Sequence, residues 1–178
     1  MSSTKERRTA YSGQYLSVSR LTVELPNNEI SHREIVHVRN AVAVLPLEQN
    51  GTVHMVSQFR HAIDKQLIEI PAGLIDEGET EEEAAIRECQ EETGYFPRSL
   101  FRLITYAHAE GYSTGYITLF LGMDLEYTGK LHLDAGEYLI SAEMAFETLL
   151  ERVKRNEIID SKTILAALLT KDKLCNPG

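Results

Sequence analysis

The chain has 178 residues, of which 43% are hydrophobic and 25% are charged, a balance typical of one globular domain with at most a small extra piece. This composition excludes collagen, a coiled coil or disorder as the main state, and no stretch approaches the roughly 18 consecutive apolar residues of a membrane-spanning helix. The net charge of −9 comes almost entirely from residues 76–92, which hold nine acidic residues and one basic residue, so the remainder lacks the basic surface of a nucleic-acid-binding protein.

The first third of the chain is predicted to form β-strands. Apolar and polar residues alternate over most of residues 15–25, and a turn at residues 26–29 separates them from a second strand over residues 30–38. The continuously apolar run at residues 41–47 is typical of a strand buried on both faces, and another strand is expected at residues 52–60.

The second half mixes helices and strands. A helix over residues 81–93 is predicted by the capping-box spacing of Thr80 and Glu83. We expect strands at residues 100–108 and 116–123, followed by two closing helices, one starting near Ser141 and one near Asp160 or Ser161. This order indicates a mixed α/β (α+β) fold, with strands around one central helix and the last helices packed outside.

Three carboxylates gather on one face of the helix over residues 81–93. Glu88, Glu91 and Glu92 fall within an arc of about 100°. Like charges at these spacings repel each other, so we expect a compensating cation, for which the oxygen-seeking ions Mg²⁺ or Mn²⁺ are suited. The alternative, which the residues leave open, is a solvated helix face.

The residues around this helix have a characteristic spacing. Gly73 is followed by five residues and Glu79, and seven more lead to the run at residues 87–95. The pattern resembles the Nudix box, G-x5-E-x7-R-E-U-x-E-E-x-G-U, in which U is a bulky aliphatic residue. All seven fixed positions match, while Cys89 and Tyr95 occupy the two U positions. The resemblance implies a Nudix-like α/β/α sandwich with a mixed β-sheet.

The resemblance also implies roles for single residues. Metal ions, Mg²⁺ or alternatively Mn²⁺, would be bound by Glu88, Glu91 and Glu92. Arg87 would pair with Glu79 to hold the loop against the helix, and Gly73 and Gly94 would serve backbone geometry. We assign Arg87 and Glu91 to the catalytic group as well.

The residues before the box narrow the resemblance. Residues 67–73 resemble the E-x-P-A-G entry of the ADP-ribose and nucleoside-diphosphate-sugar pyrophosphatases, a branch in which the carbonyl at Ala72 also binds metal. Residues 58–60 resemble the strand whose arginine contacts the substrate diphosphate. The residues expected to bind substrate are therefore Arg60, Glu69, Arg33, Arg39 and Tyr112. A surface salt bridge for Arg60, a strand-face position for the other arginines and a core or interface position for Tyr112 are the alternatives.

The branch has a small extra N-terminal subdomain. By resemblance, residues 1–38 form an N-terminal antiparallel β-hairpin subdomain that contacts substrate and pairs two subunits, and residues 39–178 form the catalytic domain. We therefore expect a homodimer.

A loop glutamate often serves as the general base in this branch. The candidates are Glu126, Asp134 and Glu137, of which Glu137 best matches the family pattern. Two positions depart from the ADP-ribose enzymes: Glu110 stands where a proline is typical, and Gly115 where an acid is typical. A broader range of sugars is consistent with both departures.

The sequence therefore predicts a Mg²⁺-dependent pyrophosphatase that hydrolyses nucleoside diphosphate sugars, such as ADP-ribose or GDP-mannose, to a nucleoside monophosphate and a sugar phosphate. The alternatives are a MutT-like enzyme that cleaves (deoxy)nucleoside triphosphates and a catalytically silent module that senses nucleotides. With two cysteines and no secretory signal, we expect a cytoplasmic protein that binds neither nucleic acid nor membranes.

Overall fold

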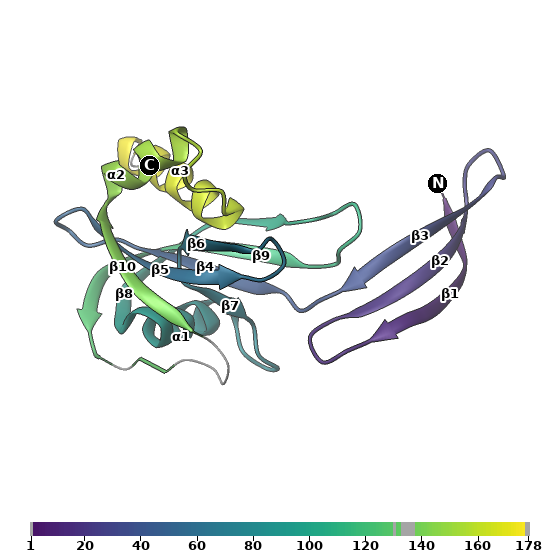
Figure 1. The fold of residues 1–178 in the computed structure, drawn as a ribbon, viewed down its shortest axis with the longest axis horizontal. Helices are drawn as coiled ribbons and strands as arrows, with labels where there is room; N and C mark the ends of the chain where they lie inside the picture. The colour runs from purple at the N-terminus through teal and green to yellow at the C-terminus, as the bar shows by residue number, and fades with distance from the viewer. Residues whose placement is uncertain (1, 130, 133–137, 177–178) are drawn as a thin grey trace. The chain divides into compact units, whose positions relative to one another are not determined.

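The computed structural model describes residues 2–129, 131, 132 and 138–176. The chain divides into two compact units (Figure 1). The first comprises Met1–Asn40 and Tyr106–Ile117, and the second comprises Ala41–Thr105 and Thr118–Gly178.

The first unit is built on a three-stranded antiparallel sheet. Its strands are β1 (Ser3–Ser12), β2 (Ser17–Glu24) and β3 (Ile30–His37), in the order β1-β2-β3. All ten residues of β1 are exposed. Because β1 has no buried face, its sequence lacks the alternation of apolar and polar residues that predicts a strand, and this strand was not predicted.

A segment from much later in the chain is attached to this sheet. Val36 of β3 donates its backbone N–H to the carbonyl of Tyr112 over 2.7 Å, and Thr114 donates to the carbonyl of Val36 over 3.0 Å. These bonds form a parallel bridge between Val36 and Ser113. The first unit therefore contains Tyr112 as well as the N-terminal strands. Tyr112 lies outside residues 1–38, which were predicted as the N-terminal subdomain.

The second unit contains two sheets. The four-stranded sheet has the order β7-β4-β9-β8 and consists of β7 (Ala72–Leu74), β4 (Ala41–Pro46), β9 (Tyr116–Tyr127) and β8 (Tyr95–Ala107). The three-stranded sheet has the order β10-β5-β6 and consists of β10 (Leu139–Ala145), β5 (Thr52–Arg60) and β6 (Lys65–Glu69), all antiparallel. The outer ends of β8 and β9 belong to the first unit.

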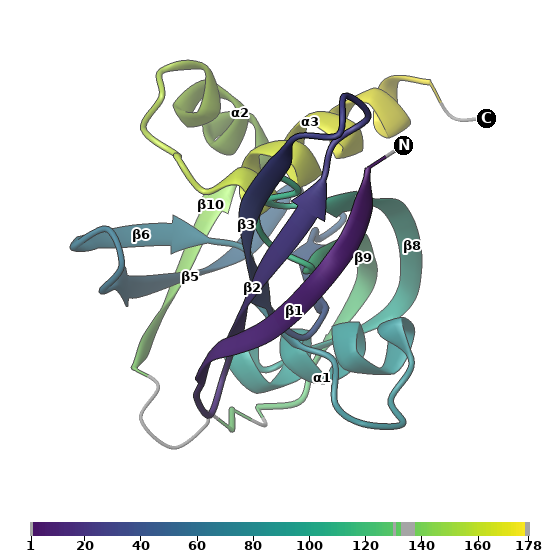
Figure 2. The ribbon, with the colours of Figure 1, turned by 90° about the vertical axis from the view of Figure 1, so that its right-hand side faces the viewer.

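Helices lie on both sides of these sheets. Figures 1 and 2 show α1 (Glu81–Thr93) on one side, and α2 (Phe146–Lys154) and α3 (Ser161–Cys175) on the other. The helix α1 starts at Thr80, which forms the predicted capping box with Glu83, and ends at Gly94 in the left-handed conformation at φ 80°. No described helix has the length and apolar character needed to cross a membrane.

The core of the second unit fixes the orientation of α1. Ala84, Ala85 and Cys89 are fully buried against Val42, Val44 and Phe120. Burial also raises the pKa of the Cys89 thiol to about 12, which makes this residue an inert apolar filler. Because the apolar side of α1 faces the sheet core, its carboxylates are confined to the remaining sides of the helix.

The predicted start of the next helix near Ser141 is wrong. Residues 139–145 form β10, in which Ser141 pairs with Val56 and Glu143 pairs with His54 of β5. The helix α2 begins only at Phe146. The spacing of apolar residues in this short stretch is compatible with a helix or a strand. Hydrogen bonding with β5 stabilises it as a strand. The last helix, α3, begins at Ser161 after an Asp160 N-cap, as predicted.

Candidate active site

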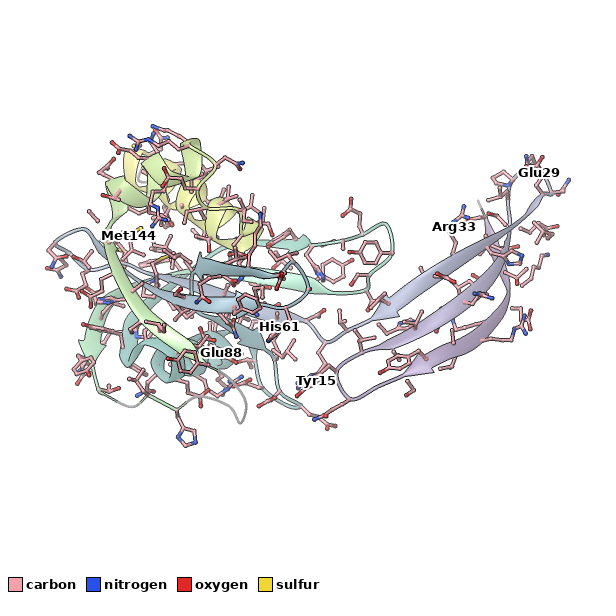
Figure 3. All side chains as sticks on the ribbon, viewed as in Figure 1. Tyr15, Glu29, Arg33, His61, Glu88 and Met144 are labelled. Carbon is pink, nitrogen blue, oxygen red and sulfur yellow. The ribbon has the colours of Figure 1, made fainter. Side chains whose placement is uncertain are left out.

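The helix α1 brings Glu88 against the backbone of β7. A methyl group built on Gly73 would overlap Oε1 of Glu88. Only glycine therefore lets this carboxylate lie so close to the strand, which explains why a glycine occupies the first position of the box. Figure 3 labels Glu88 on α1.

Glu92 contacts the neighbouring residue of the same strand. It is 7% exposed, and its Oε2 accepts a hydrogen bond from the backbone N–H of Ala72 over 3.2 Å. Because Glu88 and Glu92 are one helical turn apart, both carboxylates lie at the start of β7. The sequence-predicted metal ligands Glu88, Glu92 and Ala72 are thus brought together at this strand.

Arg87 connects the box residues to each other. Its Nε and Nη2 each donate to an oxygen of Glu79 over 2.8 Å, and Nη2 also donates to the carbonyl of Leu74 over 3.1 Å. Its Nη1 donates to Glu88 over 2.6 Å and to Glu91 over 3.2 Å. The guanidinium therefore offsets the repulsion among the carboxylates of α1.

These contacts shift the titration of both partners. The hydrogen bonds that Arg87 donates to Glu79 raise the pKa of Arg87 above its usual value and hold the pKa of Glu79 below its usual value. Glu79 also accepts a hydrogen bond from the backbone N–H of Asp76 over 3.0 Å, which fixes the loop before α1. The expected contact between Glu79 and Arg87 is present, and both groups are charged at neutral pH.

The donor set suits a hard cation. Glu88, Glu91 and Glu92 and the carbonyl of Ala72 offer only oxygen ligands, which Mg²⁺ and Mn²⁺ prefer. Within the part of the chain that the structure describes, no three His, Cys, Asp or Glu side chains already converge as a metal cage. Glu91 is partly exposed and lines a cavity of about 370 Å³ with Gln90, Leu131 and His132.

Arg60 stands at the end of β5, with its side chain 40% exposed. Its Nε and Nη2 donate to the two carboxylate oxygens of Glu69 over 2.8 and 2.6 Å. Because Glu69 is only 1% exposed, the pair is not the surface salt bridge considered as the alternative. The hydrogen bonds that Arg60 donates to Glu69 raise the pKa of Arg60 above its usual value.

The Glu69 carboxylate remains ionised despite its burial. Burial alone would raise the pKa of Glu69, but hydrogen bonds and charges from Arg60 and Lys162 outweigh this effect and hold the pKa below its usual value. The predicted substrate residues Arg60 and Glu69 are therefore a tightly connected pair within the second unit.

The other predicted substrate residues, Arg33, Arg39 and Tyr112, belong to the first unit. Arg33, labelled on β3 in Figure 3, donates to Ser31 Oγ and to the carbonyl of His32. Arg39 is exposed, and Tyr112 is 59% exposed. The exposure of Tyr112 argues against the core position considered for it.

The general base stays a prediction. Asp134 and Glu137 lie outside the described residues. Glu126, the third candidate, lies on β9 and forms an ion pair with Arg98 over 2.5 Å.

Lys162 lies beside Glu69 and was not among the predicted site residues. Lys162 in the first turn of α3 donates to both Glu69 and Asp160. A signal was available, because a lysine in the first turn of a helix is opposed by the helix dipole and usually needs an acidic partner. The partner, Glu69, is 93 residues away in the chain and could not be found from spacing.

Comparisons with known proteins identify the family of this chain. The NUDIX domain model matches residues 37–167. The ADP-ribose pyrophosphatase of Bacillus subtilis (strain 168) is 36% identical over 157 residues, which cover 88% of this chain and 85% of that protein. The GDP-mannose pyrophosphatase of Escherichia coli O1:K1 / APEC is 32% identical over 171 residues, which cover 86% of this chain and 87% of that protein.

A solved structure has the same fold. The crystal structure of ADP compounds hydrolase matches with a TM-score of 0.87 and 20% sequence identity, covering 99% of this chain and 96% of that chain. The match confirms the predicted α+β fold class with its mixed sheets, sandwich layers and N-terminal antiparallel sheet.

Proposed function

This chain belongs to the NUDIX domain family and is a Nudix hydrolase, and from this premise we propose that it hydrolyses the diphosphate of nucleoside diphosphate sugars in a reaction that depends on Mg²⁺ or Mn²⁺. The products would be a nucleoside monophosphate and a sugar phosphate. The observation that carries the proposal is the convergence of Glu88 and Glu92 on the start of β7, where only Gly73 leaves room for a carboxylate.

The metal would be held by Glu88, Glu91, Glu92 and the carbonyl of Ala72. When bound, it would neutralise the diphosphate and activate a water molecule for attack on phosphorus. Arg87 holds Glu88 and Glu91 from the side of the Glu79 loop. It thereby keeps carboxylates of like charge together until a cation binds.

Arg60 would bind a diphosphate oxygen. Glu69 occupies its Nε and Nη2, so that the guanidinium plane is fixed and Nη1 is the nitrogen that Glu69 does not engage. A planar, permanently charged guanidinium is well suited to a phosphate oxygen. Proton transfer from water would be assigned to Glu137, with Asp134 and Glu126 as the other candidates.

The substrate class is supported by two relatives, which are named ADP-ribose pyrophosphatase and GDP-mannose pyrophosphatase. Within this class, the position of Gly115 favours a broad range of sugars. A Cβ at Gly115 would lie 2.5 Å from the ring of His108 and 2.7 Å from Val38. The imidazole therefore fills the space in which the ADP-ribose enzymes typically place an acidic side chain.

We further propose that the N-terminal sheet pairs two chains and contributes Arg33, Arg39 and Tyr112 to substrate binding. A sheet normally buries one face against another layer, yet every residue of β1 is exposed in the single chain. Light scattering should then give twice the 20.1 kDa of one chain. A mass of one chain at micromolar concentrations would refute the dimer. A cytoplasmic location also stays a proposal.

The experiment for the activity is a substrate panel with Mg²⁺ and product identification by mass. The panel contains ADP-ribose, GDP-mannose, UDP-glucose, a dinucleoside polyphosphate and a deoxynucleoside triphosphate. Release of a monophosphate and a sugar phosphate from the sugar nucleotides supports the proposal. Turnover of the triphosphate alone would indicate the MutT-like enzyme, and tight binding without turnover would indicate the sensing module.

A further inference from the structure

A buried lysine lies outside the residues to which the proposed reaction assigns a role. Lys162 is 9% exposed, and its ammonium group donates to Oε2 of Glu69 and, over 2.8 Å, to Oδ1 of Asp160. A buried ammonium in the first turn of a helix is costly unless carboxylates compensate for it. Lys162 therefore depends on these two acids, and they in turn are oriented by it.

Lys162 and Arg60 share one carboxylate. Oε2 of Glu69 accepts hydrogen bonds from both Lys162 Nζ and Arg60 Nη2, while Oε1 accepts from Arg60 Nε. With donors on both oxygens, Glu69 cannot rotate without breaking one of these bonds. The guanidinium plane of Arg60 is consequently fixed by a carboxylate that Lys162 itself holds in place.

The charges of this cluster balance. Arg60 and Lys162 carry two positive charges, and Glu69 and Asp160 carry two negative charges. Glu92 and Asp160 also act electrostatically on Arg60, so its guanidinium lies within the field of an expected metal ligand. Without Lys162, the cluster around Arg60 would carry a net charge of −1 and would repel an anionic substrate.

The same helix start also holds the chain that leads to β7. Thr163 Oγ1 accepts a hydrogen bond from the backbone N–H of Ile70 over 2.9 Å. The next residue, Pro71, accepts one from Val44, and Ala72 donates to Glu92. The first turn of α3 is therefore connected through residues 69–72 to both the Arg60 pair and the carboxylates of α1.

We propose that Lys162 is a positioning residue for substrate binding, which acts through Glu69 to hold the Arg60 guanidinium in the orientation and the charge balance that a diphosphate requires. The inference rests on the proposed function, because it takes Arg60 as the diphosphate contact. It concerns binding of substrate more than the chemical step, since the carboxylates to which Lys162 donates are Glu69 and Asp160, which are not among the expected metal ligands.

The test is steady-state kinetics of Lys162→Met in the full chain with ADP-ribose and Mg²⁺. We expect KM to rise about tenfold while kcat changes less than about threefold. The matched control is Lys171→Met, which removes an exposed lysine from the same helix and should leave both constants unchanged. An unchanged KM in Lys162→Met, or a loss confined to kcat, would overturn the inference.

A double-mutant cycle separates an effect that acts through Arg60 from one that does not. In an Arg60→Ala background, Lys162→Met should change KM less than about twofold, because the group on which it acts is gone. A disturbance of the site that does not act through Arg60 would instead raise KM by the same factor in both backgrounds. Equal effects would therefore refute the positioning role.

Two further measurements keep the test decisive. If Lys162→Met does not fold, Lys162→Gln replaces it, and a wild-type KM in that uncharged variant would refute the charge argument.

If the wild-type chain cleaves no nucleotide sugar, the proposed function fails, and the inference is tested by NMR. The Arg60 Nε–H signal, assigned by its absence in Arg60→Ala, should shift or broaden in Lys162→Met or Lys162→Gln but not in Lys171→Met. An unshifted signal would contradict the coupling.

Discussion

Glu88 occupies the space that a side chain at Gly73 would need. Gly73→Ala should therefore push the Glu88 carboxylate away from β7. We expect the affinity for Mg²⁺ and the turnover of ADP-ribose to fall at least about tenfold, because a misplaced ligand weakens the metal site. Calorimetric titration with Mg²⁺ and the initial rate measure the two effects.

The control for Gly73→Ala is Gly111→Ala. No atom lies within 4 Å of a Cβ built at Gly111, and its φ is not positive. This variant should keep wild-type metal affinity. If Gly73→Ala binds Mg²⁺ as tightly as Gly111→Ala does, the close approach of Glu88 has no part in metal binding.

Glu92→Gln should nearly abolish turnover while the protein stays folded. The amide oxygen of glutamine can still accept the hydrogen bond from Ala72 that Glu92 accepts now. The lost negative charge, however, removes a metal ligand, and we expect activity to drop about a hundredfold or more. Circular dichroism and thermal unfolding with a chelator present check the fold. Full Mg²⁺-dependent activity would show that Glu92 is not a ligand.

Arg87→Lys should destabilise the metal-free protein more than the metal-bound protein. A lysine cannot reproduce the paired bonds to Glu79 and also reach Glu88 and Glu91. We expect the free energy of unfolding without metal to fall by about 1–3 kcal/mol. Saturating Mg²⁺ should recover part of the loss in chemical denaturation. Equal losses with and without Mg²⁺ would refute a counterion role for Arg87.

The buried Glu69 carboxylate makes stability depend on pH. Although burial opposes ionisation, Arg60 and Lys162 hold the pKa of Glu69 below its ordinary value of 4.5. A lowered pKa in the folded state means that the stabilisation is complete above about pH 4.5 and is lost as pH falls through the folded value. Denaturation between about pH 6 and pH 3 should show a shallower decline for Glu69→Gln than for the wild type. Parallel declines would contradict this account.

Much of the candidate site could be predicted from the sequence because the site residues lie close together in the chain. Gly73, Glu79 and Arg87 are linked by one loop and one helix, and the resemblance to the Nudix box implied the contact between Arg87 and Glu79. The strand over Thr52–Arg60 was likewise predicted with its observed bounds, because a turn precedes it and it carries the apolar residues Val53, Met55 and Val56, which are buried.

The remaining features depend on tertiary contacts that spacing does not encode. Residues 141–145 have apolar positions that suit a helix, yet they pair with β5 as a strand. Lys162 contacts Glu69 across 93 residues, and Val36 bonds to Tyr112 of a much later segment within the first unit. Exposed strands such as β1 lack the alternation of apolar and polar residues from which a strand is predicted.

The most direct test of the central claim is the cleavage of ADP-ribose and GDP-mannose by metal-stripped protein, before and after Mg²⁺ is restored, with products identified by mass. We predict no cleavage with chelator present. Restored Mg²⁺ should release a nucleoside monophosphate and a sugar phosphate from at least one of the two, and Glu92→Gln should release neither. Equal cleavage with and without metal, or no cleavage of either nucleotide sugar with Mg²⁺ or Mn²⁺, would contradict the account.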